Sequence, residues 1–326
     1  MRILIRHLVI FALLFISFNY IFAFFYEKPD RQAIINKTHD KYLKWNDLHS
    51  NKNTYDIIFL GSSIGYCAYN PIIFDSILNK YSYNMCTGSQ NIIETYYVLK
   101  DILLFQKPNI IVYEIYLPSF DNNTDYYHVI SNGNFMSIKN ELDMIINGFG
   151  MEGIANYIFP ILKNKFYIKN DLLNLFGLVK SENNPDIKKN KWIHGYLSDS
   201  TTIDTTIIRN YPHLYNFTNT QVSENKIYYY FDALIQLCKI NDIKLVCTIA
   251  PYPPSRIENS DTDTVSQYFN KVCKNNRIPF YDLNYLTNNK FKYKDTDFMD
   301  FQHMNYQGAN KVSRQLAELL FSMPMQ

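Results

Sequence analysis

The chain has 326 residues, of which 47% are apolar and 19% are charged, a composition typical of a folded globular protein rather than a disordered one. Its 32 basic and 30 acidic residues give a formal net charge of +2, and two of the arginines lie in residues 1–26, which contain no acid. The rest of the chain is electrically balanced and lacks the clustered positive charge that nucleic-acid binding requires, so we exclude nucleic acid as a partner.

The N-terminal segment has the features of a membrane helix. Residues 8–25 carry no formal charge, follow two arginines and, at 18 residues, are about as long as a membrane span. A cleaved signal peptide is the alternative, but it usually ends in a small-x-small site, and only Ala23 is small near the end of this run. We predict an uncleaved anchor over residues 1–26 and a body, residues 27–326, outside the cytoplasm, in the periplasm or at the cell surface.

From residue 55 onward, short apolar runs alternate with longer amphipathic segments, the pattern of β-α-β units around a parallel sheet. The predicted strands are residues 56–60, 82–86, 109–115, 243–249 and 279–283. The predicted helices are residues 71–79, 91–105, 222–238, 264–275 and 307–321. Because the apolar residues in these strands are continuous rather than alternating, we expect burial on both faces and an α/β three-layer sandwich with a central parallel sheet.

This rhythm is interrupted by a polar, Asn-rich region at residues 117–220. Helical fragments are predicted within it at residues 138–148 and 153–162. Long insertions in α/β domains are usually functional, and this one follows a strand at the edge where substrates bind. We interpret it as an insertion or lid of the body.

Five cysteines form an odd set with no C-x-x-C spacing and no zinc-type grouping with histidine. Several lie inside apolar patterns, so we predict buried free thiols and no metal site. The five are Cys67, Cys86, Cys238, Cys247 and Cys273.

The most informative segment is the Gly61-Ser62-Ser63 turn between the first strand and a following helical turn. A serine there is presented at the carboxyl edge of the sheet, and the backbone N–H groups of the turn point outward, where they can stabilise an oxyanion. This geometry favours Ser63 as a nucleophile. The alternative is that the turn is only a helix N-cap.

A second segment, Asp300-Phe301-Gln302-His303, lies just before the last helix. Serine catalysis requires a base for the hydroxyl proton and usually a carboxylate that orients the base. A tight turn would let Asp300 orient His303. The alternative is a polar loop histidine beside a turn residue.

Together, Gly61-Ser62-Ser63, Gly88 after the second strand and Asp300-x-x-His303 resemble the SGNH/GDSL hydrolase superfamily in order and spacing. The likeness is greatest to membrane-anchored, exported members such as the D-alanyl-transfer protein of teichoic-acid synthesis and the alginate O-acetylation proteins. It covers about residues 55–116 and 222–321.

The resemblance implies that Ser63 is the nucleophile, His303 the general base and Asp300 its orienting carboxylate. It also implies that the backbone N–H groups of Ser63 and Gly88 form the oxyanion hole. Two positions depart from the family pattern. Ser62 stands where Asp usually precedes the nucleophile, and the third block, Gly-x-Asn-Asp, is replaced by Glu114-Ile115-Tyr116-Leu117-Pro118. The Asn donor of that block is missing, so Gln90 or Asn91 beside Gly88 are candidate substitutes.

These features predict an exported serine acyl-esterase or O-acyltransferase that acts on acyl esters, acetyl being the expected group, of a cell-surface glycan or other acylated polymer. No cofactor is needed. If it is a transferase, the resemblance implies a polytopic membrane O-acyltransferase as partner. The alternative from another class is a non-catalytic glycan-binding or assembly protein with a degenerate SGNH fold, which the missing third block favours. A secreted lipase would require an apolar cleft, against which the polar insertion argues.

Overall fold

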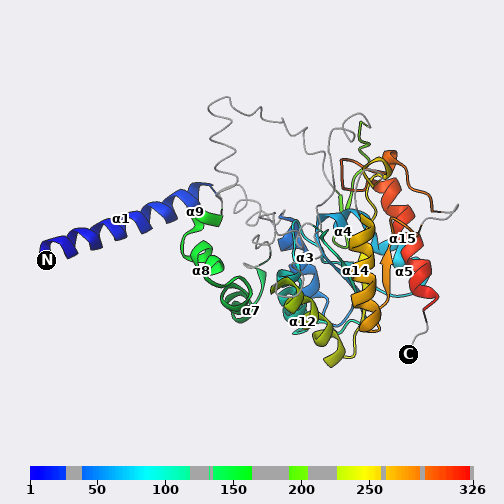
Figure 1. Cartoon of the computed structure of the whole chain (residues 1–326), viewed down its shortest axis with the longest axis horizontal. Helices are drawn as coiled ribbons and strands as arrows, with labels where there is room; N and C mark the ends of the chain where they lie inside the picture. The colour runs from blue at the N-terminus through cyan, green and yellow to red at the C-terminus, as the bar shows by residue number, and fades with distance from the viewer. Residues whose placement is uncertain are drawn as a thin grey trace.

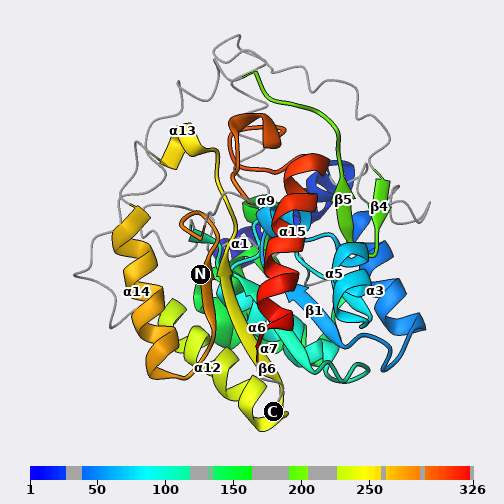
Figure 2. The same cartoon turned by 90° about the vertical axis from the view of Figure 1, so that its right-hand side faces the viewer.

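A five-stranded, fully parallel sheet forms the centre of the computed structural model (Figures 1 and 2). In spatial order its strands are β2 (Ser82–Asn84), β1 (Ile57–Leu60), β3 (Ile110–Glu114), β6 (Lys244–Ile249) and β7 (Phe280–Asp282). All four residues of β1 are buried, as a strand covered on both faces requires. The structure describes residues 1–26, 39–117, 132, 135–163, 191–204, 226–257, 262–286 and 291–323.

Helices cover both faces of the sheet, which confirms the predicted three-layer α/β architecture. On one face α5 (Pro71–Leu78) packs against α15 (Tyr306–Phe321). On the other, α6 (Ile92–Ile102) packs against α12 (Lys226–Ile240), and α12 contacts α14 (Thr262–Asn275) through Phe231 and Phe269. The predicted start of α12 at residue 222 lies outside the described residues.

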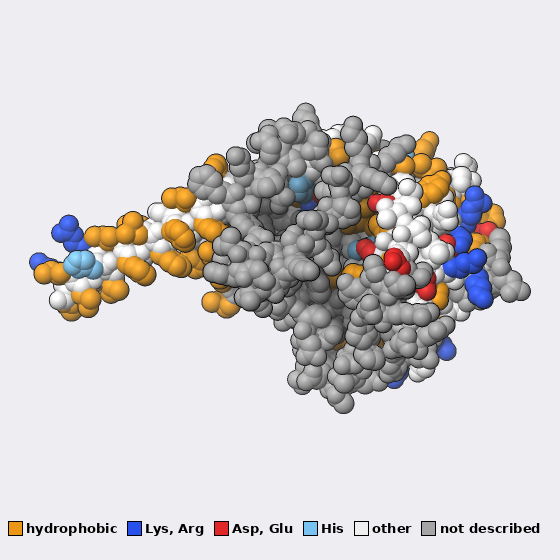
Figure 3. Space-filling model, turned by 90° about the horizontal axis from the view of Figure 1, so that it is seen from above, with side chains coloured by type: hydrophobic (Ala, Val, Ile, Leu, Met, Phe, Trp, Pro, Cys, Tyr) orange, Lys and Arg blue, Asp and Glu red, His pale blue; other side chains and the backbone are white. Residues whose placement is uncertain are grey.

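The apolar N-terminal segment forms one helix, α1 (Arg2–Tyr26), that extends away from the body (Figure 1). Residues 2–24 are long and apolar enough to cross a membrane, and only 11% of the most apolar window is buried. Figure 3 shows hydrophobic side chains along this arm, with basic and histidine side chains at its tip. The helix is therefore compatible with a membrane anchor or a signal sequence.

Both helical fragments predicted within the insertion are present. They form α7 (Ile138–Asp143), the π-helix η4 (Met144–Phe149), α8 (Gly150–Ile158) and α9 (Pro160–Lys163). Most of the remaining insertion lies outside the described residues, so its role as a lid stays a prediction.

A helix and a hairpin are among the elements that the sequence did not predict. Helix α3 (Asp40–Ser50) precedes the sheet, and a small antiparallel hairpin, β4 (Lys191–Ile193) and β5 (Tyr196–Ser198), lies beside α4 (Ser63–Ala68). Trp45 of α3 contacts Phe105, and β5 contacts α4, so both pack against residues distant in sequence. The five cysteines are free and buried, as predicted.

Candidate active site

Ser63 begins α4, directly after the turn that follows β1. Gly61 makes this turn possible, because its φ is +145° and a Cβ there would lie 2.7 Å from the Cβ of Glu114. Ser62 caps the helix: its Oγ accepts a hydrogen bond from the backbone N–H of Ile64 at 3.2 Å. The turn therefore places Ser63, partly buried, at the carboxyl edge of the sheet.

Asp300 and His303 lie in a tight turn between the 3-10 helix η6 (Asp295–Asp297) and α15. One carboxylate oxygen of Asp300, Oδ1, accepts hydrogen bonds from the backbone N–H groups of Gln302 at 2.8 Å and His303 at 2.7 Å. The other oxygen, Oδ2, lies 2.7 Å from Nδ1 of the His303 ring. Asp300 thus fixes both the turn and the orientation of the imidazole.

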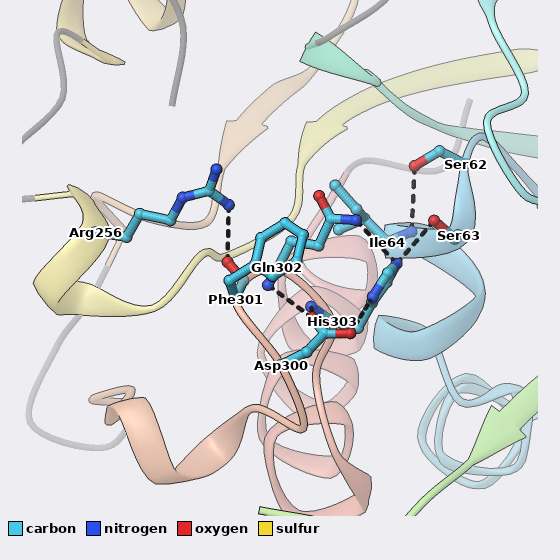
Figure 4. A network of polar contacts seen from close by, with 8 residues as sticks. All are labelled: Ser62, Ser63, Ile64, Arg256, Asp300, Phe301, Gln302 and His303. Carbon is cyan, nitrogen blue, oxygen red and sulfur yellow. Dashed lines mark hydrogen bonds and ion pairs between the residues drawn. The ribbon is translucent and has the colours of Figure 1, made fainter. Parts of the chain in front are cut away.

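The two turns, 240 residues apart in sequence, meet at one hydrogen bond: Nε2 of His303 lies 2.8 Å from Oγ of Ser63 (Figure 4). A carboxylate can only accept, so Asp300 selects the tautomer with the proton on Nδ1 and leaves Nε2 to accept from the Ser63 hydroxyl. The structure therefore brings Ser63, His303 and Asp300 together in the connectivity of a nucleophile, base and orienting acid.

The charge state of Asp300 suits this arrangement. Burial acts to raise its pKa, but the hydrogen bonds and charge of His303 and the backbone N–H of Gln302 outweigh burial, and the pKa of Asp300 lies below its ordinary value. The carboxylate is therefore ionised at neutral pH and can stabilise an imidazolium formed on His303.

Arg256 contacts Phe301, which lies in the turn between Asp300 and His303. It belongs to the short helix α13 (Pro254–Ile257) and donates from Nη1 to the backbone carbonyl of Phe301 at 2.8 Å (Figure 4). Its guanidinium carbon lies 5.1 Å from the centre of the Phe301 ring. Arg256 thereby ties the turn that carries His303 to the segment after β6.

The predicted oxyanion residues divide into two groups. Gly88 lies in the turn after β2, and within the described part of the chain nothing comes within 4 Å of the position that a Cβ would take there. Gln90 and Asn91 are buried: Nε2 of Gln90 donates to Thr95 at 3.1 Å, and Oδ1 of Asn91 accepts from the N–H of Glu94 at 2.9 Å to cap α6. These bonds turn both side chains toward the protein interior, so we retain only the backbone N–H groups of Ser63 and Gly88 as expected donors.

Glu114, at the end of β3, lies beneath the nucleophile turn and is almost fully buried. Its Oε2 accepts hydrogen bonds from both the backbone N–H and the Oγ of Ser62, each at 2.9 Å. Burial raises the pKa of Glu114 to about 7, although the bonds from Ser62 and the charge of His303 act to lower it. Ser62 and Glu114 together hold the turn at the position where the family pattern has one Asp.

Lys44, on α3, is a second buried charged group beside the site. Its Nζ donates to the backbone carbonyl of Cys86, just before the turn that contains Gly88, and lies 5.0 Å from the ring of Tyr66 and 4.9 Å from that of Trp192. Burial lowers the pKa of Lys44 to about 8. Sequence reasoning misses Lys44 because its partners lie on three other segments.

No protein-family model and no curated protein matches this chain. Among solved structures it is similar to a protein from Desulfitobacterium hafniense described as a lipolytic protein of the G-D-S-L family, at 9% identity and a TM-score of 0.40, covering 81% of this chain and 98% of that one. An acylhydrolase from Bacteroides fragilis (12% identity, TM-score 0.36, 81% and 87% coverage) and a GDSL-like lipase from Bacteroides thetaiotaomicron (12%, 0.35, 81% and 88%) are also similar.

Proposed function

We propose that this chain is an exported, membrane-anchored serine acyl-esterase or O-acyltransferase, with Ser63 as nucleophile, His303 as general base and Asp300 as the carboxylate that orients it. The observation that carries the proposal is the continuous hydrogen-bonded path from Ser63 Oγ through the His303 ring to Asp300. Helix capping alone explains Ser62 but gives no reason for an imidazole, itself fixed by a carboxylate, to lie on Ser63.

The chemistry follows from this path. Ser63 Oγ attacks the acyl carbon of an ester while its proton passes to Nε2 of His303, and the negative charge on the carbonyl oxygen is met by the backbone N–H groups of Ser63 and Gly88. The ester C–O bond then breaks, and the proton on His303 passes to the departing alkoxide. The acyl group is left on Ser63. Water or a sugar hydroxyl, deprotonated by His303, then attacks the acyl-enzyme and releases Ser63.

We propose acyl esters of a cell-surface glycan, with acetyl as the group, as the substrate class. The sequence resemblance to exported members that modify surface polymers and the apolar helix α1 support this choice. A transferase would receive its acyl group from a polytopic membrane O-acyltransferase, which the anchor would keep nearby.

One observation favours a second candidate, a non-catalytic glycan-binding or assembly protein. Where the family pattern has Gly-x-Asn-Asp with its Asn oxyanion donor, this chain reads Glu114-Ile115-Tyr116-Leu117-Pro118 and lacks that Asn. The Glu114 carboxylate is instead used to hold Ser62. Loss of one oxyanion donor typically lowers the rate about 10²–10³-fold. An enzyme with two backbone donors would be slow but measurable.

Hydrolysis of p-nitrophenyl acetate by the full chain in mild detergent tests the proposal. We expect Ser63→Ala and His303→Ala to lower kcat about 10³-fold or more. Ser76→Ala, which removes an exposed serine of α5, is the matched control and should retain wild-type turnover. Wild-type turnover no higher than that of the two variants, in folded protein, would count against an esterase and leave a water-excluding transferase or a binding protein.

A further inference from the structure

Helix α9 of the insertion, together with the junction at which it follows α8, packs against α1. The rings of Phe159 and Phe15 lie 6.0 Å apart, centre to centre, and Asn19 of α1 is buried against the same segment. The insertion therefore contacts α1 at Phe15 and Asn19, and Figure 1 shows α9 beside this helix.

The contact is centred on a break in the helix. Pro160 ends α8 and begins α9, because proline has no N–H to continue the hydrogen-bond ladder. At this break Oδ1 of Asn19 accepts from the backbone N–H of Ile161 at 3.1 Å, and its Nδ2 donates to the backbone carbonyl of Ile158 at 3.5 Å. Asn19 therefore satisfies backbone groups on both sides of the break, a requirement that is strict only where water is absent.

The composition of the segment points to the same environment. Residues 153–162, which lie between Glu152 and Lys163, contain no formally charged side chain. An apolar run of this length is too short to span a membrane, and it usually marks a buried core helix or a re-entrant or interfacial membrane segment. A core helix is excluded by exposure, because Tyr157 is 53% exposed, Ile158 44% and Leu162 39%.

We propose that α8 and α9 enter the lipid bilayer beside α1 as a re-entrant hairpin, with Asn19 capping its break. The proposal is that lipid covers the exposed apolar side chains of α8 and α9, because these side chains adjoin the apolar surface of α1. This inference rests on the anchor in the proposed function. Phe15 lies ten residues before Phe25, about 15 Å along the helix, so the Phe15–Phe159 contact lies near the middle of a hydrocarbon core about 30 Å thick.

The same insertion is also fixed to the body. Nζ of Lys100 on α6 lies 2.7 Å from Oδ2 of Asp143, and Nδ2 of Asn140 donates to Oδ1 of Asp101 at 2.7 Å. With α8 and α9 in lipid and α7 bound to α6, the insertion would fix the distance and orientation of the sheet edge that carries Ser63 relative to the membrane. A substrate at the membrane surface would then be reached without a flexible tether.

Tryptophan quenching by brominated phospholipid tests this placement in the full chain reconstituted into vesicles. The reporters are Met151→Trp on α8, Phe11→Trp on α1 and Phe321→Trp at the far end of α15, all at exposed positions, with the wild-type emission subtracted. We expect comparable loss of emission from Met151→Trp and Phe11→Trp and none from Phe321→Trp. Quenching of Phe11→Trp without Met151→Trp would overturn the hairpin and leave the anchor intact.

The remaining outcomes are also decisive. An unquenched Phe11→Trp would overturn the anchor and the hairpin together, and ester hydrolysis would still be judged by its own assay. Quenching of Phe321→Trp to the same extent would mean that lipid covers the whole body, which also contradicts a specific hairpin.

A second change tests the role of Asn19. In the Met151→Trp background, Asn19→Leu should reduce the quenching, because the backbone groups at the break lose their partner within the hydrocarbon. Ser17→Leu, at an exposed position of α1, is the matched control and should leave the quenching unchanged. Equal quenching in Asn19→Leu and Ser17→Leu would show that Asn19 does not hold the hairpin.

Discussion

Replacing Glu114 with glutamine should change how the stability of the fold depends on pH. Burial raises the pKa of Glu114 from 4.5 to about 7. Below pH 4.5 the side chain is protonated in both the folded and the unfolded chain. Between pH 4.5 and 7 the unfolded chain releases the proton and the folded chain keeps it, so the free energy of unfolding falls as pH rises and levels off above pH 7.

The size of this fall follows from the two pKa values. At 1.36 kcal/mol for each pH unit, the wild type should lose about 3 kcal/mol of stability relative to Glu114→Gln across this window. Glutamine does not titrate, and its weaker hydrogen bonds with Ser62 add only a constant difference.

Urea unfolding of the full chain in mild detergent, followed by circular dichroism at several pH values, measures this difference. Glu318→Gln, on an exposed carboxylate of α15, is the control for removing one negative charge. A free-energy difference between the wild type and Glu114→Gln that stays constant from pH 4.5 to 7 would refute the reasoning, because it would mean that the buried carboxylate does not hold its proton.

Three further substitutions test the parts of the site. Gly61→Ala should lower the free energy of unfolding by about 2–4 kcal/mol, measured by urea unfolding, because the turn needs φ of +145° and has no room for a Cβ beside Glu114; an unchanged midpoint would contradict the tight turn. Lys44→Met should lower kcat for p-nitrophenyl acetate about tenfold, since the turn after β2 loses a buried charged donor, whereas Lys274→Met on an exposed lysine should not. Asp300→Asn should lower kcat about 10³–10⁴-fold with an unchanged circular dichroism spectrum, because an amide no longer fixes the histidine tautomer; near-normal turnover would remove Asp300 from its proposed role.

The sequence predicts the sheet well because each strand's own run of apolar residues indicates that the strand is buried. Residues 57–60, for example, are apolar at every position, as a strand covered on both faces requires. The Gly61-Ser62-Ser63 turn and the Asp300-x-x-His303 turn are equally local, since each is defined by residues within four positions. Their meeting at one hydrogen bond follows from the parallel topology, which brings both turns to the carboxyl edge of the sheet.

The supports of the site could not be predicted in the same way. Glu114 contacts Ser62 across 52 residues, and Lys44 reaches the Cys86 carbonyl across 42, so neither pair leaves a periodic pattern. The one available signal was a carboxylate at the end of an otherwise apolar strand, which requires an unusual partner when buried. Gln90 illustrates the converse: its position beside Gly88 favours an oxyanion role, but Thr95 takes its amide.

The central claim is that Ser63 is an activated nucleophile, and covalent labelling with a fluorophosphonate tests it most directly because no acceptor or natural substrate is needed. Phosphonylation forms a bond from Ser63 Oγ to phosphorus and expels fluoride, whether the acyl-enzyme normally goes to water or to a glycan. We expect one adduct on the full-length chain, located by peptide mass spectrometry to Ser63, absent from Ser63→Ala and strongly slowed in His303→Ala. Folded wild-type protein that stays unlabelled, or labels at other serines as readily as at Ser63, would contradict an enzyme built on this site and favour the binding protein.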